Sequence, residues 1–171
     1  FANMKVTLIS DTHSYMDERI IHHLGGSDLI IHAGDVGDSK VLDSIEKIAP
    51  TRCVYGNIDG TNIRSRCPEW EIIDLMGHKT LVIHIAGSVG RYNENTRTLI
   101  AAHQPDSIIC GHSHILKVMP DKKFNLLHLN PGAAGRYGFH KMRTILKFEV
   151  DNANMRNLQV IELGPRSSQS V

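Results

Sequence analysis

The hydrophobic positions in the N-terminal part of the chain alternate between two kinds of spacing. Continuous apolar runs at 4–9, 28–33 and 53–55 are typical of short strands buried on both faces of a sheet. Between these runs, residues 16–24 and 39–48 place apolar side chains at helical spacing, and each segment is followed by glycine or proline. This strand–helix–strand–helix–strand order predicts three adjacent parallel strands joined by right-handed crossovers.

The remainder of the chain is richer in strand-like patterns. We expect a helix over 94–103 and strands over 71–75, 80–85, 107–110, 115–119, 125–129, 143–150 and 155–163. Residues 76–79 predict a hairpin turn between the first two of these strands. A parallel first part and a β-rich second part favour an α/β fold in which two sheets pack face to face with helices outside.

The chain is expected to form a single domain. No repeat, linker or low-complexity segment divides its 171 residues, a length that allows one substantial core. Residues 1–3 precede the first methionine and are expected to be foreign to the fold, and residues 164–171 are expected to form a polar tail. We recognise no secretory signal, and no run approaches the ~18 consecutive apolar residues of a membrane span, so no membrane association is expected.

Composition and charge argue against several classes of partner. Lys and Arg number 19 and Asp and Glu 18, and the net charge of +1 favours neither nucleic acid nor an anionic membrane as a partner. Aromatic residues make up only 5% of the chain, so a base-stacking platform is not expected. Three cysteines without CxxC spacing favour reduced thiols in a cytoplasmic protein over a disulfide framework.

Side chains that can bind metal lie at the ends of five of the predicted strands. They are Asp11, His13, Asp35, Asn57, His84, His112 and His114. Taken singly, each has a plainer interpretation as a turn residue, a helix cap or a hydrogen-bonded structural histidine. Because open α/β sheets keep their chemistry beyond the carboxyl ends of the strands, the set together predicts one shared site. In extended chain, residues i and i+2 point to the same side ~6.6 Å apart, which would direct both members of each Asp/His or His/His pair into it.

The types of ligand in this set indicate two divalent cations and an anionic substrate. Carboxylate, amide and imidazole ligands suit Mn, Fe, Ni or Zn, of which we favour Mn. Two divalent ions bring four positive charges, Asp11 and Asp35 remove two, and a bound hydroxide removes a third. The remaining charge of about +1 attracts an anion such as a phosphate ester.

The order of these motifs resembles a known family. The matching motifs are Asp11-x-His13, Gly34-Asp35, Gly56-Asn57, His84, Gly111-His112-x-His114 and Asn130-Pro131-Gly132. They resemble the calcineurin-like metallophosphoesterases, above all the small single-domain phosphodiesterases of bacteria and archaea. The resemblance implies an αββα sandwich of two mixed sheets flanked by helices. It also implies a two-metal site, with Asp11, His13, Asp35 and His114 on one ion and Asp35, Asn57, His84 and His112 on the other.

The resemblance implies that Asp35 bridges the ions and that a metal-activated hydroxide hydrolyses a small phosphodiester. We expect Asp35, Asn57 and His84 to take part in catalysis. Many members of the superfamily have histidine after the asparagine, where it protonates the leaving group, but this chain has Ile58. Because a phenolate needs little protonation, aryl diesters should be cut faster than alkyl diesters, unless another residue such as His140 supplies the acid.

Neighbouring residues receive plainer interpretations. His32 is expected to pack under the site, Asp59 to orient the Asn57 loop, and the 130–132 turn to hold a loop near the site. Arg91, Arg136 and His140 are either solvated side chains or substrate contacts.

Two alternatives to catalysis remain open. One is a scaffold that resembles the metallophosphoesterase-like subunit of retromer, which also lacks the acid histidine. The other is a metal-dependent sensor that binds nucleotides without turnover. Relatives are often dimers or tetramers, which leaves a homo-oligomer open.

Overall fold

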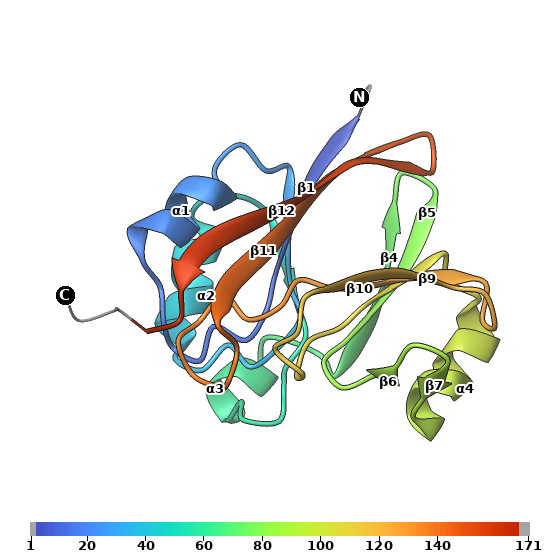
Figure 1. The fold of residues 1–171 in the computed structure, drawn as a ribbon, viewed down its shortest axis with the longest axis horizontal. Coiled ribbons are helices and arrows are strands. Elements are labelled where there is room, and N and C mark those ends of the chain that lie inside the picture. Colours follow the sequence, from blue (N-terminus) through green and yellow to red (C-terminus); the bar gives the residue numbers. More distant parts are fainter. Residues whose placement is uncertain (1–2, 168–171) are drawn as a thin grey trace.

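Two five-stranded mixed sheets lie face to face in the computed structural model, which describes residues 3–167 (Figure 1). The first sheet has the order β12 (Asn154–Pro165), β11 (Met142–Asp151), β1 (Met4–Ile9), β2 (Leu29–His32) and β3 (Thr51–Cys53). Strands β1, β2 and β3 are adjacent and parallel, which confirms the crossover prediction. Strand β11 is antiparallel to both β1 and β12, so the two ends of the described chain share this sheet.

The second sheet has a parallel centre and two antiparallel edges. Its order is β4 (Trp70–Leu75), β5 (His78–Ile83), β8 (Ser107–Ile109), β10 (Leu126–Asn130) and β9 (Lys117–Asp121). The predicted hairpin joins β4 to β5, and Met76 and Gly77 both have positive φ, the geometry that matches the twist of a two-residue hairpin. A small ribbon of β6 (Gly87–Ser88) and β7 (Arg91–Tyr92) follows β5.

Helices cover the outer faces of both sheets and complete an αββα sandwich, as predicted. Helices α1 (Glu18–Leu24), α2 (Ser39–Glu46) and α3 (Thr61–Arg64) contribute to one apolar core with the first sheet, and α4 (Glu94–His103) packs on the second sheet (Figure 1). A third core fills the space between the sheets. Within the described part of the chain, no helix is long and apolar enough to cross a membrane.

Alternating side chains on the central strands pack into two of these cores, one on each face of the sheet. In β1, Leu8 lies in the core between the sheets, whereas Ile9 lies in the core under α1 and α2. Successive strand residues point to opposite faces, so a strand buried on both sides has a continuous apolar run. This is why the first strands were recognisable in the sequence.

Element ends differ from the prediction for local reasons. The first helix begins at Glu18 because the side chain of Asp17 caps it by accepting from the Ile20 amide. The strand expected at 115–119 lies at 117–121, and the helix expected over 39–48 ends at 46. The predicted polar tail is wrong at its start, since β12 continues to Pro165, which is paired with Met142. Residues 1–2, which were expected to be foreign to the fold, and residues 168–171 of the predicted tail lie outside the described residues.

Candidate metal centre

All seven predicted ligands lie just beyond the carboxyl ends of the parallel strands. Asp11 and His13 follow β1, Asp35 follows β2, Asn57 follows β3, His84 follows β5, and His112 and His114 follow β8. Each sheet therefore supplies ligands from its parallel strands, and the two sets face each other across the sandwich. The structure brings these residues together as two clusters of potential metal ligands, with Asn57 between two of the histidines.

The backbone that carries these side chains is turned, not extended. Positive φ values occur at Asp11 (53°), His13 (44°), Asp35 (57°), His112 (72°) and His114 (62°). The prediction that the i and i+2 pairs belong to extended chain is therefore wrong. Such conformations are uncommon for residues other than glycine and cost on the order of 1–3 kcal/mol each. Hydrogen bonds between loops hold two of them, from the Asp11 amide to the Gly34 carbonyl (3.0 Å) and from the His13 amide to the Asp35 carbonyl (3.0 Å).

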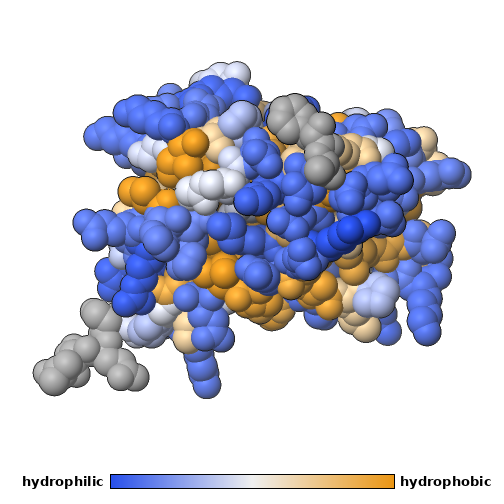
Figure 2. Space-filling view, turned by 90° about the horizontal axis from the view of Figure 1, so that it is seen from above, coloured by the Kyte–Doolittle hydropathy of each residue, from blue (hydrophilic) through white to orange (hydrophobic). Residues whose placement is uncertain are grey.

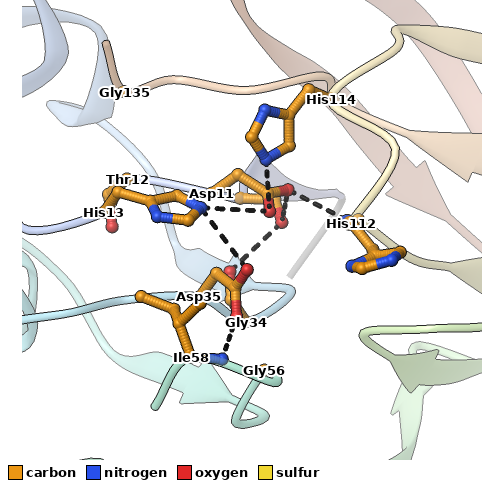
Figure 3. A network of polar contacts seen from close by, with 12 residues as sticks. Asp11, Thr12, His13, Gly34, Asp35, Gly56, Ile58, His112, His114 and Gly135 are labelled. Carbon is orange, nitrogen blue, oxygen red and sulfur yellow. Dashed lines mark hydrogen bonds and ion pairs between the residues drawn. The ribbon is translucent and has the colours of Figure 1, made fainter. Parts of the chain in front are cut away.

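The first cluster contains Asp11, His13 and His114, whose ligand atoms all lie within 4.8 Å of one another. The Asp11 Oδ1 atom is 3.3 Å from His114 Nε2 and 3.9 Å from His13 Nε2. Figure 3 shows these side chains converging from three directions, with the carboxylates of Asp11 and Asp35 both facing the same nitrogen of the His13 ring. Asp11 is completely buried, so its carboxylate has little access to bulk water.

The second cluster contains Asp35, His84 and His112, again within 4.8 Å of one another. His84 Nε2 lies 3.2 Å from Asp35 Oδ2, and the same carboxylate oxygen lies 3.4 Å from His13 Nε2 in the first cluster. The Asn57 side-chain oxygen lies 3.1 Å from His84 Nε2 and 3.0 Å from His112 Nδ1. Asp35 thus stands between the two clusters.

Several lone pairs in these clusters face one another, which fits a bound cation. The His84 Nδ1 atom donates to the Ala33 carbonyl at 2.7 Å, so in a neutral ring the Nε2 lone pair points at the oxygens of Asp35 and Asn57. Within the described residues, Asp11 Oδ1 and His13 Nε2 are buried without a hydrogen-bond partner. Buried polar atoms normally find partners, and a divalent cation bound here would supply the missing positive charge. The donor set therefore fits the implied metals.

The pKa values of Asp35 and His84 are shifted by burial and by neighbouring polar groups. Burial by itself raises the pKa of Asp35, but the neighbouring imidazoles of His13 and His84 and the hydrogen bond from the Ile58 amide outweigh it and hold the pKa well below its ordinary range. Burial lowers the pKa of His84, and the carboxylates of Asp35 and Asp11 more than offset this and raise it. Asp35 is therefore an ionised carboxylate at neutral pH.

Residues around the ligands hold the loops in place. Asp59 accepts from the backbone amides of Val36, Gly37 and Gly56, which ties the Asp35 loop to the Asn57 loop. A Cβ on Gly56 would overlap Asp35. These contacts agree with the interpretation of Asp59 as an orienting residue.

His32 lies under the site, as its sequence position indicated. Its Nδ1 atom accepts from the Gly34 amide at 3.1 Å, which leaves Nε2 to donate to the Thr12 hydroxyl at 3.0 Å. Burial lowers the pKa of His32 to about 4, and the ring is neutral and structural. Asn130 donates to the Gly111 carbonyl and so fixes the loop that carries His112, as expected for the 130–132 turn.

Three supporting groups were missed in the sequence. The Ser10 hydroxyl donates to Asp11 Oδ2 at 2.7 Å, the Ile58 amide donates to Asp35 Oδ1 at 3.0 Å, and the Ala33 carbonyl accepts from His84. Ser10 was recognisable as a polar residue directly after a buried strand. Backbone groups carry no such signal, because every residue has them.

The remaining candidates have other partners. Arg136 donates to the Arg166 carbonyl, and Arg91 is exposed on β7. His140 Nε2 donates to the Gly135 carbonyl at 2.8 Å, and burial lowers the pKa of this ring. The geometry therefore commits the His140 proton to the backbone and does not favour this residue as the replacement acid.

Two facing mixed sheets with carboxylate–imidazole clusters at their parallel strand ends are typical of metal-dependent phosphoesterases. The chain belongs to the calcineurin-like phosphoesterase superfamily, whose domain model matches residues 4–153 and whose members use divalent metals. The resemblance inferred from the motifs is thereby confirmed.

Individual relatives agree with this family. A Methanocaldococcus jannaschii protein named "Probable metallophosphoesterase" is 33% identical over 165 residues, covering 93% of this chain and 82% of its own. A single mutant of Vps29 from Entamoeba histolytica has a similar fold, with a TM-score of 0.73, 16% identity and coverage of 93% of this chain and 99% of its own. The structure of an archaeal phosphodiesterase gives a TM-score of 0.72 at 21% identity, covering 92% and 100%.

Proposed function

We propose that this protein uses two divalent cations to hydrolyse small phosphodiesters, and we favour Mn²⁺ as the metal. One observation carries the proposal: two clusters of potential ligands share the neighbourhood of a single ionised carboxylate, Asp35. Asp11, His13, Asp35 and His114 would hold one cation, and Asp35, Asn57, His84 and His112 would hold the other. Cations bound there supply electrophilic stabilisation of the phosphate and a lowered pKa for an attacking water.

The chain's own groups have distinct roles in this proposal. Asp35 is positioned by the Ile58 amide and contributes the charge shared by both clusters. Asn57 provides a neutral oxygen beside His84 and His112, so it adds no charge that would repel an anionic substrate. His84 is oriented by the Ala33 carbonyl, which fixes the nitrogen that faces the site.

The side chain after Asn57 indicates the substrates that are best used. Ile58 is 46% exposed and has no proton to give, although its amide is bonded to Asp35. The leaving group is then protonated only by solvent, which matters little for a phenolate and much for an alkoxide. General acid catalysis contributes roughly 10²–10⁴-fold, so aryl diesters should be hydrolysed far faster than alkyl diesters.

Metal analysis combined with a diester assay tests this function. The protein is loaded with Mn²⁺, its bound metal is counted, and hydrolysis of bis(4-nitrophenyl) phosphate is followed. The Asp35→Asn variant should lose both turnover and part of the bound metal. Wild-type protein that binds two ions per chain but releases no nitrophenolate from any mono- or diester would contradict the proposal.

A non-catalytic scaffold is the second candidate. It is favoured by the fold similarity to Vps29 and by the missing acid histidine at Ile58. A scaffold does not require the ligand set, so a protein that binds no divalent metal would support it. Metal binding and tight nucleotide binding without turnover would instead indicate a sensor.

We also propose a reducing, cytoplasmic environment for this enzyme. Cys53, Cys67 and Cys110 are all buried free thiols, and free thiols are usual in that compartment.

A further inference from the structure

A cavity of about 360 Å³ adjoins both ligand clusters. His112 and His114, one from each cluster, form the wall nearest the metal centre. The apolar part of its lining consists mainly of Ile115, Tyr137 and Phe139. Any group held in this cavity therefore lies next to both proposed metal positions.

The apolar side chains of this wall are unusually exposed. Phe139 is 101% exposed, Tyr137 69% and Ile115 64%, the three highest values among the large hydrophobic side chains of the described chain. Leaving such side chains in water is unfavourable, and their gathering at one cavity indicates a ligand-binding surface. Figure 2 shows the molecule from the side on which β1 begins. Hydrophilic residues cover most of that face, and apolar residues lie in areas between them.

The loop that presents the two rings is anchored to the metal centre. We call residues 135–140 the aromatic loop. The Gly135 amide donates to the Asp11 carbonyl at 3.1 Å, and the Arg166 side chain donates to the His140 carbonyl at 2.9 Å. The Gly135 end of the loop is therefore fixed to the first ligand cluster, and the His140 end to the segment after β12.

Close packing against two ligand histidines fixes the Tyr137 ring and the loop backbone at Gly138. The Tyr137 ring stacks on the His13 ring, with 4.9 Å between centroids. Gly138 has a φ of 128°, and a Cβ there would overlap the His114 ring. The loop thus holds the Tyr137 ring beside the ligands, and preorganisation of this kind favours ligand binding.

We propose that this cavity binds an aromatic ester group of the phosphate substrate. This assignment rests on the proposed function and narrows its substrate class to phosphate esters with a planar apolar arm. Phosphate oxygens would lie toward His112 and His114, and the arm would contact Ile115, Tyr137 and Phe139. Aromatic groups stack favourably on such rings, whereas a methyl ester offers little to contact.

Binding of two phosphonates tests the cavity without any turnover. Phenylphosphonate and methylphosphonate are titrated calorimetrically into the Mn²⁺-loaded protein. We expect phenylphosphonate to bind about tenfold more tightly than methylphosphonate. In Phe139→Ala and in Ile115→Ala this ratio should fall to about threefold or less, because part of the apolar contact is lost. Both side chains are largely exposed, so thermal stability should not change.

A matched variant and a parallel assay separate the outcomes. Ile21 is 46% exposed on α1, and Ile21→Ala should keep the wild-type ratio. Equal binding of both phosphonates, binding of neither, or an unchanged ratio in Phe139→Ala would overturn the cavity assignment. A Phe139→Ala variant that turns a wild-type oligomer into a monomer would also overturn it, since the ring would then belong to an interface between copies.

Hydrolysis of bis(4-nitrophenyl) phosphate is measured on the same samples. Turnover without discrimination between the phosphonates overturns the cavity assignment and leaves the proposed function standing. Discrimination without turnover supports the cavity and contradicts the hydrolase.

Discussion

Replacing Asp59 with asparagine tests how the loops of the metal centre are held. Asp59 is only 3% exposed and accepts from the amides of Val36 (3.2 Å), Gly37 (2.9 Å) and Gly56 (2.8 Å). Its Oδ2 atom serves the first and third of these amides, and Oδ1 serves the second. One buried carboxylate therefore connects the loops after β2 and β3.

The structure gives the size of the expected effect. An asparagine keeps one acceptor oxygen and turns the other into an NH₂ group, so one backbone amide faces a donor and the other bonds lose their charge. A hydrogen bond to a charged group is worth ~1.5–3 kcal/mol and an unsatisfied buried donor costs ~1–3 kcal/mol, so we expect Asp59→Asn to lower the free energy of unfolding by about 3 kcal/mol. Because Asp35 and Asn57 lose their orientation, affinity for Mn²⁺ should fall about 10–100-fold.

Asp121 provides a matched control far from the ligands in the sequence. It is also 3% exposed and also accepts from three backbone amides, those of Gly90, Lys123 and Phe124. Asp121→Asn should therefore lose similar stability but keep its metal affinity. Urea denaturation of the metal-free proteins and calorimetric titration with Mn²⁺ measure the two quantities. An unchanged metal affinity in Asp59→Asn, or an equal loss in Asp121→Asn, would refute the reasoning.

Further predictions concern catalysis, packing and pH. Ile58→His should raise kcat on alkyl diesters by roughly 10²-fold or more and leave aryl diesters nearly unchanged, and equal rates before and after would count against a missing acid. Gly56→Ala should abolish tight Mn²⁺ binding, measured by calorimetry, because its Cβ overlaps Asp35; wild-type affinity would contradict this. Burial, with a smaller contribution from Lys117, lowers the pKa of His128 from 6.5 to about 4. The unfolded chain then binds a proton that the folded chain does not, so stability should be lost as pH falls from 6.5 to about 4, and His128→Asn should flatten this slope in denaturation curves.

Much of the fold was predictable because its signals are local. The runs that became β1 and β2 are largely apolar because both faces of each strand are buried, and the helical spacing of α2 was clear over two turns. Helix α3 and the ribbon of β6 and β7 were missed because four-residue and two-residue elements are too short to show a period. The seven ligand candidates were recognised because each follows a strand end, where parallel sheets place their functional groups.

The sequence by itself therefore determined the layer architecture and the set of candidate ligands. Only the tertiary structure decided how these candidate ligands meet, since the left-handed turns at Asp11 and His13 depend on hydrogen bonds to a loop distant in the chain. It also decided that the rings of Tyr137 and Phe139 stay in water beside the site, although such residues are usually buried. The physical reason is that hydrophobic periodicity is a property of one segment, whereas convergence and exposure depend on every segment that packs around it.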